Sequence, residues 1–456
     1  MTKSTRDGKE LETKKMKTKP LTFYPVIKLL SKVFLVVIST LLPSAPAWCS
    51  DEDYFEQALT YTVEITSQIK TPFIEDSQGI YSGAGFLVDK ERGWIVTNAH
   101  VASYSPAKIK VSFKDEDFIP GETVYVDSYL DLAVIKIAPE KISNDKTEVN
   151  LKCDGDLKIG HPVGAFGHPW DFSYTGTKGI ISGKTSNYGN ELLQTDAPIN
   201  AGNSGGPLIS LKTGEVIGIN TSSYDDDDDQ NTNFAEQVKF VCRVLELLKQ
   251  GKDPSSVKVL FNFLVDPFKG RTMIVSNVYL NDGYIDLQEG DKIVKVIGYG
   301  PLKNEGDLIH ALRGRSDDFS LEILRDGDTK IISGKLDTHD HIVNRKGVMV
   351  SGMLISNYWY RDMSLLDLPK FMIHFVNPGS LAEGLLINSG LYLELIDGKS
   401  FDTLGILYSY LKEHEGKDIK IKTASTDGSN ANYYLTHYKY ILRVKDLSFL
   451  GGLPGE

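Results

Sequence analysis

Cysteine is scarce in this chain, which has only three, Cys49, Cys153 and Cys242, among 456 residues. Three cysteines cannot build the disulfide framework that stabilises small secreted domains, so hydrophobic cores must hold the fold together. Cys153 and Cys242 either pair in an oxidising compartment or remain two buried thiols. We expect the thiols, because the sequence does not place the two Cβ atoms at bridging distance.

The apolar run near the N terminus, VFLVVISTLL, is too short for a transmembrane helix, which needs roughly 20 residues. Lysines precede it and the small-residue stretch PSAPA follows it, which is the layout of a signal peptide. Residues 1–50 are therefore predicted to be a signal peptide or N-terminal targeting segment cleaved after Ala47. A lipoprotein is disfavoured because Trp48 stands where a lipobox has a small residue. We expect export to the periplasm or the extracellular space, with an organellar address as the alternative left by the long lysine-rich stretch.

Outside this segment, basic residues are fewer than acidic ones. Residues 1–50 hold nine Lys or Arg and three Asp or Glu, which leaves 41 basic and 58 acidic residues and a net charge of −17 in the remainder. An acidic surface repels polyanions, so nucleic-acid binding is not expected.

The length of 456 residues suggests about three domains. Hydrophobic residues make up 41% and charged residues 24%, an ordinary globular composition that excludes a disordered or multi-span membrane chain. Short β-rich runs separated by Gly, Asp and Asn fill residues 81–223 and predict an all-β barrel or sandwich. The run FVCRVLELLKQGKDP then predicts a closing helix that ends near Gly251 and Pro254.

A weak repeat follows. EGDKIVKVIG at 289–298 is echoed by SGLYLELIDG at 389–398, and an amphipathic stretch comes after each copy. A strand, a turn glycine and a helix repeated about 100 residues apart predict two related modules, a size that is common for domains. The boundary between them is expected in the polar run His339–Lys346.

The β-rich region contains the parts needed for peptide hydrolysis: a nucleophile, a base, a group that orients the base and donors for an oxyanion. TDAPINAGNSGGPL places Ser204 between glycines that allow a tight turn. We assign the oxyanion hole to the amides of Gly202 and Ser204, with help from Asn203. A plain Gly-Ser hairpin turn is the alternative for this motif alone.

Two further motifs favour the catalytic interpretation. IVTNAHV puts His100 after a β-run, where its ring can accept the serine proton, and YLDLAVIKI puts Asp131 at the head of an apolar strand. Taken singly, each residue is more often structural than catalytic. The order His, Asp, Ser is that of the chymotrypsin-like arrangement, and not that of subtilisins or α/β-hydrolases.

GAGFLV, TNAHV, DLAVIKI, GHPWDFSYTGTKGIISG and QTDAPINAGNSGGPL resemble matching blocks of the HtrA/DegP serine protease family. The resemblance implies a mostly β fold, a chymotrypsin-like double β-barrel at 51–250 followed by two PDZ-like α+β modules at 256–338 and, more divergent, 345–445. It implies His100, Asp131 and Ser204 as the triad. It also implies an ATP-independent endopeptidase that cleaves unfolded or misfolded proteins and forms a homo-oligomer, a trimer or a multiple of trimers.

The specificity pocket departs from the family. A GFAIP-like segment is replaced by YDDDDDQNTNFAEQV, in which Phe234 and Ala235 fit the pattern and the next two residues do not. By position, the substrate-binding residues are expected to be Ile199, Asn220, Thr221 and Phe234, which would favour a small or medium apolar side chain before the cut.

No metal or other cofactor is expected. The run Asp225–Asp229 offers clustered carboxylates, but it lacks the alternating spacing and the glycine of an EF-hand, which favours a solvated acidic loop over a calcium site. His161 and His168 have no Cys, Asp or Glu at metal-ligand spacing and are expected to be structural.

The PDZ resemblance implies grooves for C-terminal peptides, with loops near Val259–Phe263 and Gly347–Gly352. Neither loop has a Gly-Leu-Gly-Phe pattern, so assembly or regulation is the alternative role of these modules. The main rival for the whole chain is a chaperone or PDZ scaffold whose protease activity is latent or lost. A narrow-specificity signalling protease is a third possibility.

Overall fold

The computed structural model describes residues 50–451, apart from 169–173, 186–190, 224–231, 258, 260, 267–269, 279–284, 316–318, 336–342, 344, 358–368 and 428–433. The predicted signal peptide, the acidic run Asp225–Asp229 and most of His339–Lys346 therefore lie outside the described residues. Within these ranges, no helix combines the length and the apolarity needed to cross a bilayer.

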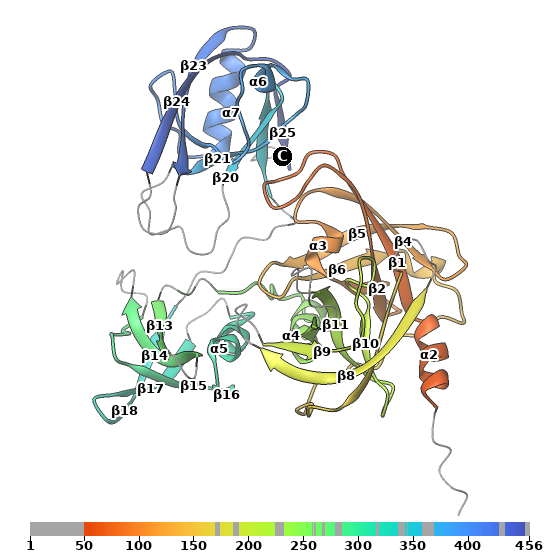
Figure 1. Ribbon diagram of the computed structural model, residues 1–456. Helices are drawn as coiled ribbons and strands as arrows, with labels where there is room; N and C mark the ends of the chain where they lie inside the picture. Colours follow the sequence, from red (N-terminus) through yellow and green to blue (C-terminus); the bar gives the residue numbers. More distant parts are fainter. Residues whose placement is uncertain are drawn as a thin grey trace, which may run out of the picture. The chain divides into compact units, whose positions relative to one another are not determined.

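The first half of the protease-like region is a closed six-stranded barrel (Figure 1). Its strands, in the order in which they pair, are β1 (Thr62–Ile69), β2 (Gly79–Asp89), β3 (Trp94–Thr97), β6 (Leu132–Ile137), β5 (Ile119–Asp127) and β4 (Ala107–Phe113). Five of the six side chains of β6 are buried, as its LAVIKI sequence predicts for a strand that fills a barrel. The helix α2 (Asp51–Leu59) precedes this barrel, the short helix α3 (Ala99–Ala102) follows β3, and the 3₁₀ turn η1 (Pro139–Lys141) follows β6.

The second half is another closed six-stranded barrel. Its strands, in pairing order, are β10 (Pro207–Ser210), β11 (Val216–Ser223), β12 (Asn233–Gln237), β9 (Leu192–Thr195), β8 (Thr175–Thr185) and β7 (Pro162–Gly167). The two barrels confirm the chymotrypsin-like double β-barrel expected from the sequence. The predicted closing helix is also confirmed as α4 (Val238–Lys249), after which Gly251 has a φ of +68°.

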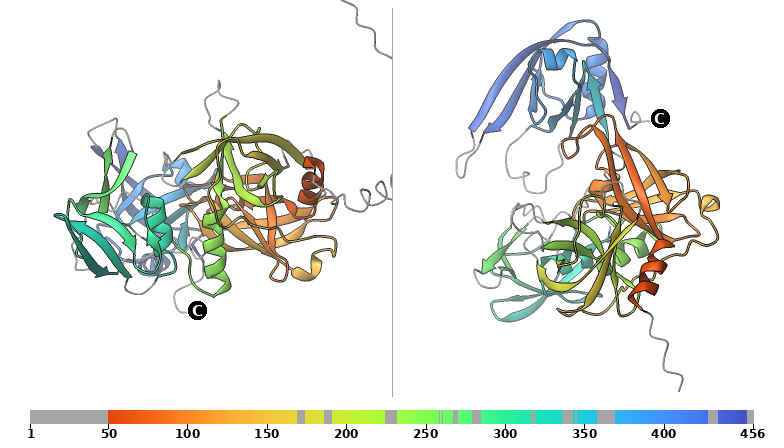
Figure 2. Two further views of the ribbon diagram at one scale, coloured as in Figure 1. Left: turned by 90° about the horizontal axis from the view of Figure 1, so that it is seen from below. Right: turned by 45° about the vertical axis from the view of Figure 1, so that its right-hand side comes forward.

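Two sheets, each with helices of its own, follow the barrels. The first sheet contains β13 (Phe261–Asp266), β14 (Gly270–Val278), β15 (Lys292–Val296), β16 (Gly300–Pro301), β17 (Phe319–Arg325) and β18 (Asp328–Gly334), with helix α5 (Glu305–Leu312). The second contains β19 (Gly347–Val350), β20 (Met353–Asn357), β21 (Phe371–Val376), β22 (Tyr392–Ile396), β23 (Asp418–Asp427), β24 (Tyr434–Arg443) and β25 (Ser448–Leu450), with helices α6 (Leu381–Gly384) and α7 (Leu404–Glu413). In Figure 2 the long β23–β24 hairpin is the blue-violet arm of the second sheet.

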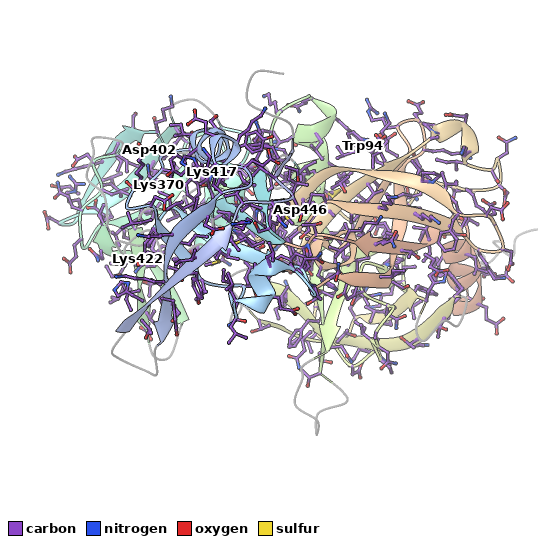
Figure 3. The ribbon with its side chains drawn as sticks, turned by 90° about the horizontal axis from the view of Figure 1, so that it is seen from above. Trp94, Lys370, Asp402, Lys417, Lys422 and Asp446 are labelled. Atoms are coloured by element: carbon purple, nitrogen blue, oxygen red, sulfur yellow. A yellow bond between two sulfur atoms is a disulfide. The ribbon has the colours of Figure 1, made fainter. Side chains whose placement is uncertain are left out.

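The internal repeat is confirmed at the level of single residues. Its two copies form β15 and β22, which begin at the same position of the repeat, and Gly290 and Gly390 before them both have a positive φ. The helix after each strand has a side-chain N-cap: Asn304 accepts from the amide of Asp307, and Thr403 accepts from that of Ile406. On the surface of the second copy, Lys370 and Asp402 form an exposed ion pair of 2.9 Å (Figure 3).

One sequence-based expectation fails here. Cys153 and Cys242 form a disulfide with a Cα–Cα distance of 5.8 Å, so the expectation of two buried thiols is wrong. Helix α2 packs against the second barrel of the same chain, since Phe55 meets Phe166 edge to face at 4.6 Å and the Tyr54 hydroxyl donates to the carbonyl of Lys212.

Candidate active site

The helix that carries His100 is one turn long and is fixed at its start by the residue at the head of β6. The amide of Ala99 and the side-chain amide of Asn98 both donate to the carbonyl of Asp131, at 3.0 and 2.9 Å. Because these bonds join the β3–α3 connection to the start of β6, two motifs about 30 residues apart in sequence meet at one point.

Asp131 has a φ of +45°, a conformation that non-glycine residues rarely adopt. Its carboxylate is bound from several sides: Oδ2 lies 2.7 Å from Nδ1 of His100 and accepts from the hydroxyl of Thr221 at 2.9 Å, while Oδ1 accepts from the amide of His100 at 3.0 Å and from the hydroxyl of Tyr104 at 3.1 Å. The carboxylate therefore fixes both the backbone and the ring of His100.

This surrounding determines how His100 titrates. Burial disfavours the protonated ring, but the hydrogen bond and charge of Asp131, together with the charge of Asp76, outweigh burial and raise the pKa of His100 above its ordinary value. A ring held this way is oriented to exchange a proton through its other nitrogen, Nε2.

Ser204 lies in the loop before β10, and its carbonyl accepts from the amide of Ala84 in the first barrel at 2.8 Å. The two residues after it must be glycines, because other parts of the chain come too close to leave room for a side chain. A Cβ on Gly205 would lie 2.1 Å from Oγ1 of Thr97, and one on Gly206 would lie 2.0 Å from the carbonyl oxygen of Phe166. The loop can thus approach the His100 region only because these side chains are missing.

The hydroxyl of Ser204 donates to the carbonyl of Thr221 at 2.8 Å, and no hydrogen bond joins it to His100 among the described residues. Within the same ranges, the amides of Gly202 and Ser204 make no backbone hydrogen bond, which suits predicted oxyanion donors. The amide of Asn203 donates instead to the carbonyl of Asn200, and its side chain is buried.

The four expected substrate-binding residues are all buried in the second barrel. The side-chain amide of Asn220 donates to the carbonyls of Phe166 and Pro207, and so it joins strands within the barrel. Ile199 belongs to the core of this barrel, and Phe234 lies on β12. Thr221 is the one that reaches the predicted triad, where its hydroxyl binds Asp131 and its carbonyl binds Ser204.

Sequence reasoning did not identify Tyr104 and Asp76 near the site. Tyr104 comes soon after the TNAHV motif, on the segment that follows α3. Its position could therefore have marked it as a neighbour of the site. Asp76 lies 24 positions before His100 in an irregular loop, where no motif marks it.

His161 and His168, expected to be structural, each bind a neighbour within the chain. Nε2 of His161 lies 2.8 Å from the hydroxyl of Ser210, and Nδ1 of His168 accepts from the amide of Tyr174 at 3.2 Å. Burial lowers the pKa of His168 to about 4, which keeps the ring neutral. No group of three or more potential metal ligands is found in the part of the chain that the structure describes.

The double barrel with His100, Asp131 and Ser204 at one place defines the class of trypsin-like serine peptidases, and the family model described as "Trypsin-like peptidase domain" matches residues 83–219. Human (Homo sapiens) "Serine protease HTRA3" is 31% identical over 312 residues, which cover 62% of this chain and 67% of that protein. The chain belongs to the HtrA/DegP family of serine proteases.

Other relatives match over shorter parts of their length. The "Probable periplasmic serine endoprotease DegP-like" of Hahella chejuensis is 37% identical over 182 residues, which cover 39% of this chain and only 37% of that protein. Among solved structures, "HtrA-type protease AlgW with decapeptide" has a TM-score of 0.50 at 22% identity and covers 64% of this chain and 99% of that one. This structural likeness concerns the fold.

Proposed function

We propose that the chain is an ATP-independent serine endopeptidase that cleaves unfolded or misfolded proteins, with His100, Asp131 and Ser204 as its catalytic triad. Ser204 Oγ attacks the peptide carbonyl while its proton passes to Nε2 of His100, and the amides of Gly202 and Ser204 bind the oxyanion. His100 then protonates the leaving amine as the C–N bond breaks. Water releases the acyl group by the reverse transfers, and no cofactor takes part.

The observation that carries this proposal is the double role of Thr221. One residue binds the carboxylate of Asp131 through its hydroxyl and the hydroxyl of Ser204 through its carbonyl. Thr221 thus holds both the nucleophile, through its carbonyl, and the group that orients the base, through its hydroxyl. Turning the Ser204 hydroxyl from the Thr221 carbonyl toward His100 would engage the base.

Redox chemistry and the relatives support the proposed compartment. A disulfide joins Cys153 and Cys242, and disulfides persist in oxidising compartments. Relatives in Hahella chejuensis and in Ectopseudomonas mendocina are described as probable periplasmic. We therefore propose that residues 1–50 direct export and that the mature protein acts in the periplasm.

We also propose that residues 51–250 form the protease domain and that 256–338 and 345–445 form two PDZ-like modules, in a homo-oligomer built from trimers. In the second module, the turn expected to bind a peptide carboxylate is engaged by its own chain. The amide of Ser351 donates to the carbonyl of Lys445 at 2.7 Å, and the carbonyl of Gly352 accepts from the amide of Asn377. We therefore propose that the first module, along β13, is the one that captures peptides.

The test is cleavage of unfolded casein by the mature chain, together with labelling by a fluorophosphonate. We expect both in the wild type and neither in Ser204→Ala. Only an aligned triad with an open oxyanion hole reacts fast with the label, so failure of the wild type to label or cleave would favour a chaperone or scaffold. Addition of C-terminal peptides in parallel tests whether a module regulates cleavage.

A further inference from the structure

The loop between β1 and β2, residues 70–78, places a carboxylate beside the end of the helix that carries His100. Oδ2 of Asp76 accepts from the hydroxyl of Ser103 at 2.8 Å and from that of Ser105 at 2.5 Å. The hydroxyl of Ser105 in turn accepts from the amide of Phe73 at 2.8 Å. The middle of the loop is thus tied to Ser103 and Ser105, just after α3.

Ser103 needs this support. It is the C-cap of α3, where its amide donates to the carbonyl of Ala99 at 2.7 Å, and its φ is +87°, a conformation that residues with a Cβ rarely adopt. Because α3 has only four residues, its C-cap lies three positions after His100, so the geometry of the cap can influence the direction of His100. The hydrogen bond from Ser103 to Asp76 therefore bears on the ring that must accept the serine proton.

The charges that face His100 come from two elements besides its own helix. Asp131, at the head of β6, contacts the ring directly, and the hydroxyl of Tyr104 binds that carboxylate. The charge of Asp76, on the 70–78 loop, also raises the pKa of the His100 ring. Burial raises the pKa of Asp76 itself. The neighbouring Glu75 is paired with Arg345.

The same stretch of the loop is also held by the second C-terminal module. Phe73 is fully buried, with its ring edge to face with His374 at 5.2 Å and the guanidinium of Arg345 lying 4.0 Å from the ring centroid. Arg345 binds both carboxylate oxygens of Glu75, at 2.7 and 3.0 Å, and the amide of Ile74 donates to Nδ1 of His374 at 3.3 Å. These contacts fix residues 73–75, next to Asp76.

We propose that Asp76 is a positioning residue for His100 and that the second C-terminal module, through Arg345 and His374, holds the loop that presents it. The inference rests on the proposed function. It assigns a role in the protease site to a module that contributes none of the predicted triad residues.

The test is Asp76→Asn in the full mature chain, which keeps the shape and the acceptor oxygen and removes the charge. The titration of the His100 ring is followed by NMR, with its signal assigned by comparison with His100→Gln. We expect His100 to titrate at lower pH in Asp76→Asn and to be unchanged in the control Asp117→Asn, which removes an exposed carboxylate from the same barrel. A titration in Asp76→Asn identical to that of the wild type would overturn the proposal.

The second readout is reactivity. The inactive form carries a protonated His100, so the acid limb of the fluorophosphonate labelling rate should shift in the same direction as the NMR titration. For Asp76→Ala, which also loses the bonds to both serines, we expect kcat on casein to fall on the order of tenfold or more with little change in KM, as small misplacement of a catalytic group does. Absence of labelling in the wild type would refute the proposed function, whereas the NMR titration decides the inference independently.

The contribution of the module is tested by Arg345→Met, which removes both the guanidinium over Phe73 and the bond to Glu75. We expect the labelling rate of this variant to be several-fold lower than that of the wild type. Thermal unfolding verifies that the variant is folded under the conditions of the assay. The matched control is Arg443→Met, which removes an arginine that binds both oxygens of Asp418 within the same module. Equal labelling rates in Arg345→Met and Arg443→Met would overturn the part assigned to the module.

Discussion

The hydroxyl of Thr221 donates a hydrogen bond of 2.9 Å to Oδ2 of Asp131, the same oxygen that lies 2.7 Å from Nδ1 of His100. Thr221 belongs to β11 of the second barrel and Asp131 precedes β6 of the first. The orientation of the histidine therefore depends on a bond between the two barrels, and not only on the barrel that carries both His100 and Asp131.

Replacing Thr221 by Val removes this donor and preserves the side-chain shape. A hydrogen bond to a charged group contributes about 1.5–3 kcal/mol, so we expect kcat on casein to fall by roughly ten- to a hundredfold. Thr221→Ser keeps the hydroxyl and should stay within a few-fold of the wild type. Steady-state kinetics on both variants provide the check, and equal losses would show that the hydrogen-bond donor alone does not account for the effect of Thr221.

Gly205→Ala tests the close approach between the Ser204 loop and the first barrel. The added Cβ would lie 2.1 Å from Oγ1 of Thr97 and 2.2 Å from the carbonyl oxygen of Ala84, so the loop must move and fluorophosphonate labelling should be lost. The matched control is Gly160→Ala, since Gly160 has a φ of +83° against +84° for Gly205 but no atom within 4 Å of an added Cβ. This control should suffer only the strain of its backbone, about 1–3 kcal/mol of stability, and retain labelling. Loss of labelling in both variants would point to backbone strain alone.

Local patterns explain why much of this site was predictable. His100, Asp131 and Ser204 each follow or begin an apolar strand, and the glycines around Ser204 are required by contacts that a short motif already implies. The repeat in the C-terminal half was recognisable for the same reason, because a strand between two turn glycines is encoded within ten residues.

What the sequence did not predict depends on contacts between distant segments. Cys153 and Cys242 are separated by 89 positions, and only the packing of α4 brings them together. The hydrogen bonds from the side-chain amide of Asn220 to the carbonyls of Phe166 and Pro207 also join segments far apart in the sequence. Asp76 carries no motif, because its relation to α3 exists only after the barrel has closed.

The disulfide gives a stability prediction. A bridge that closes a long loop typically contributes about 2–4 kcal/mol, which for a domain of this size corresponds to roughly 5–15 °C in Tm. We expect dithiothreitol to lower the Tm of the wild type by this amount. The double variant Cys153→Ala/Cys242→Ala should melt at the lower temperature in either condition. A wild-type Tm insensitive to the reductant would mean that the bridge does not form or adds no stability.

Asp127 and Arg313 form an ion pair that is almost fully buried, with exposed side-chain fractions of 2% and 0%. Burial alone would raise the pKa of Asp127, but the charge and hydrogen bond of Arg313 outweigh it and hold that pKa below its ordinary value. A depressed pKa in the folded state means that the pair stabilises the protein above the ordinary Asp value, and that this contribution is lost as the pH falls through the folded value.

Arg313→Met leaves Asp127 buried without its partner, so we expect a loss of about 3–5 kcal/mol at pH 7 in urea unfolding. Without the arginine, the pKa of Asp127 rises, so at acid pH the protein can fold with this carboxyl neutral. The cost of burying an unpaired charge is then removed. The difference in stability between wild type and variant should therefore narrow toward about pH 4, the ordinary range for Asp. Arg443→Met, which breaks a pair whose side chains are about half exposed, should cost little stability at pH 7, because solvent screens surface ion pairs. A loss in Arg313→Met that is equally large at pH 7 and at pH 4 would show that packing of the side chain, and not its charge, is what Arg313 contributes.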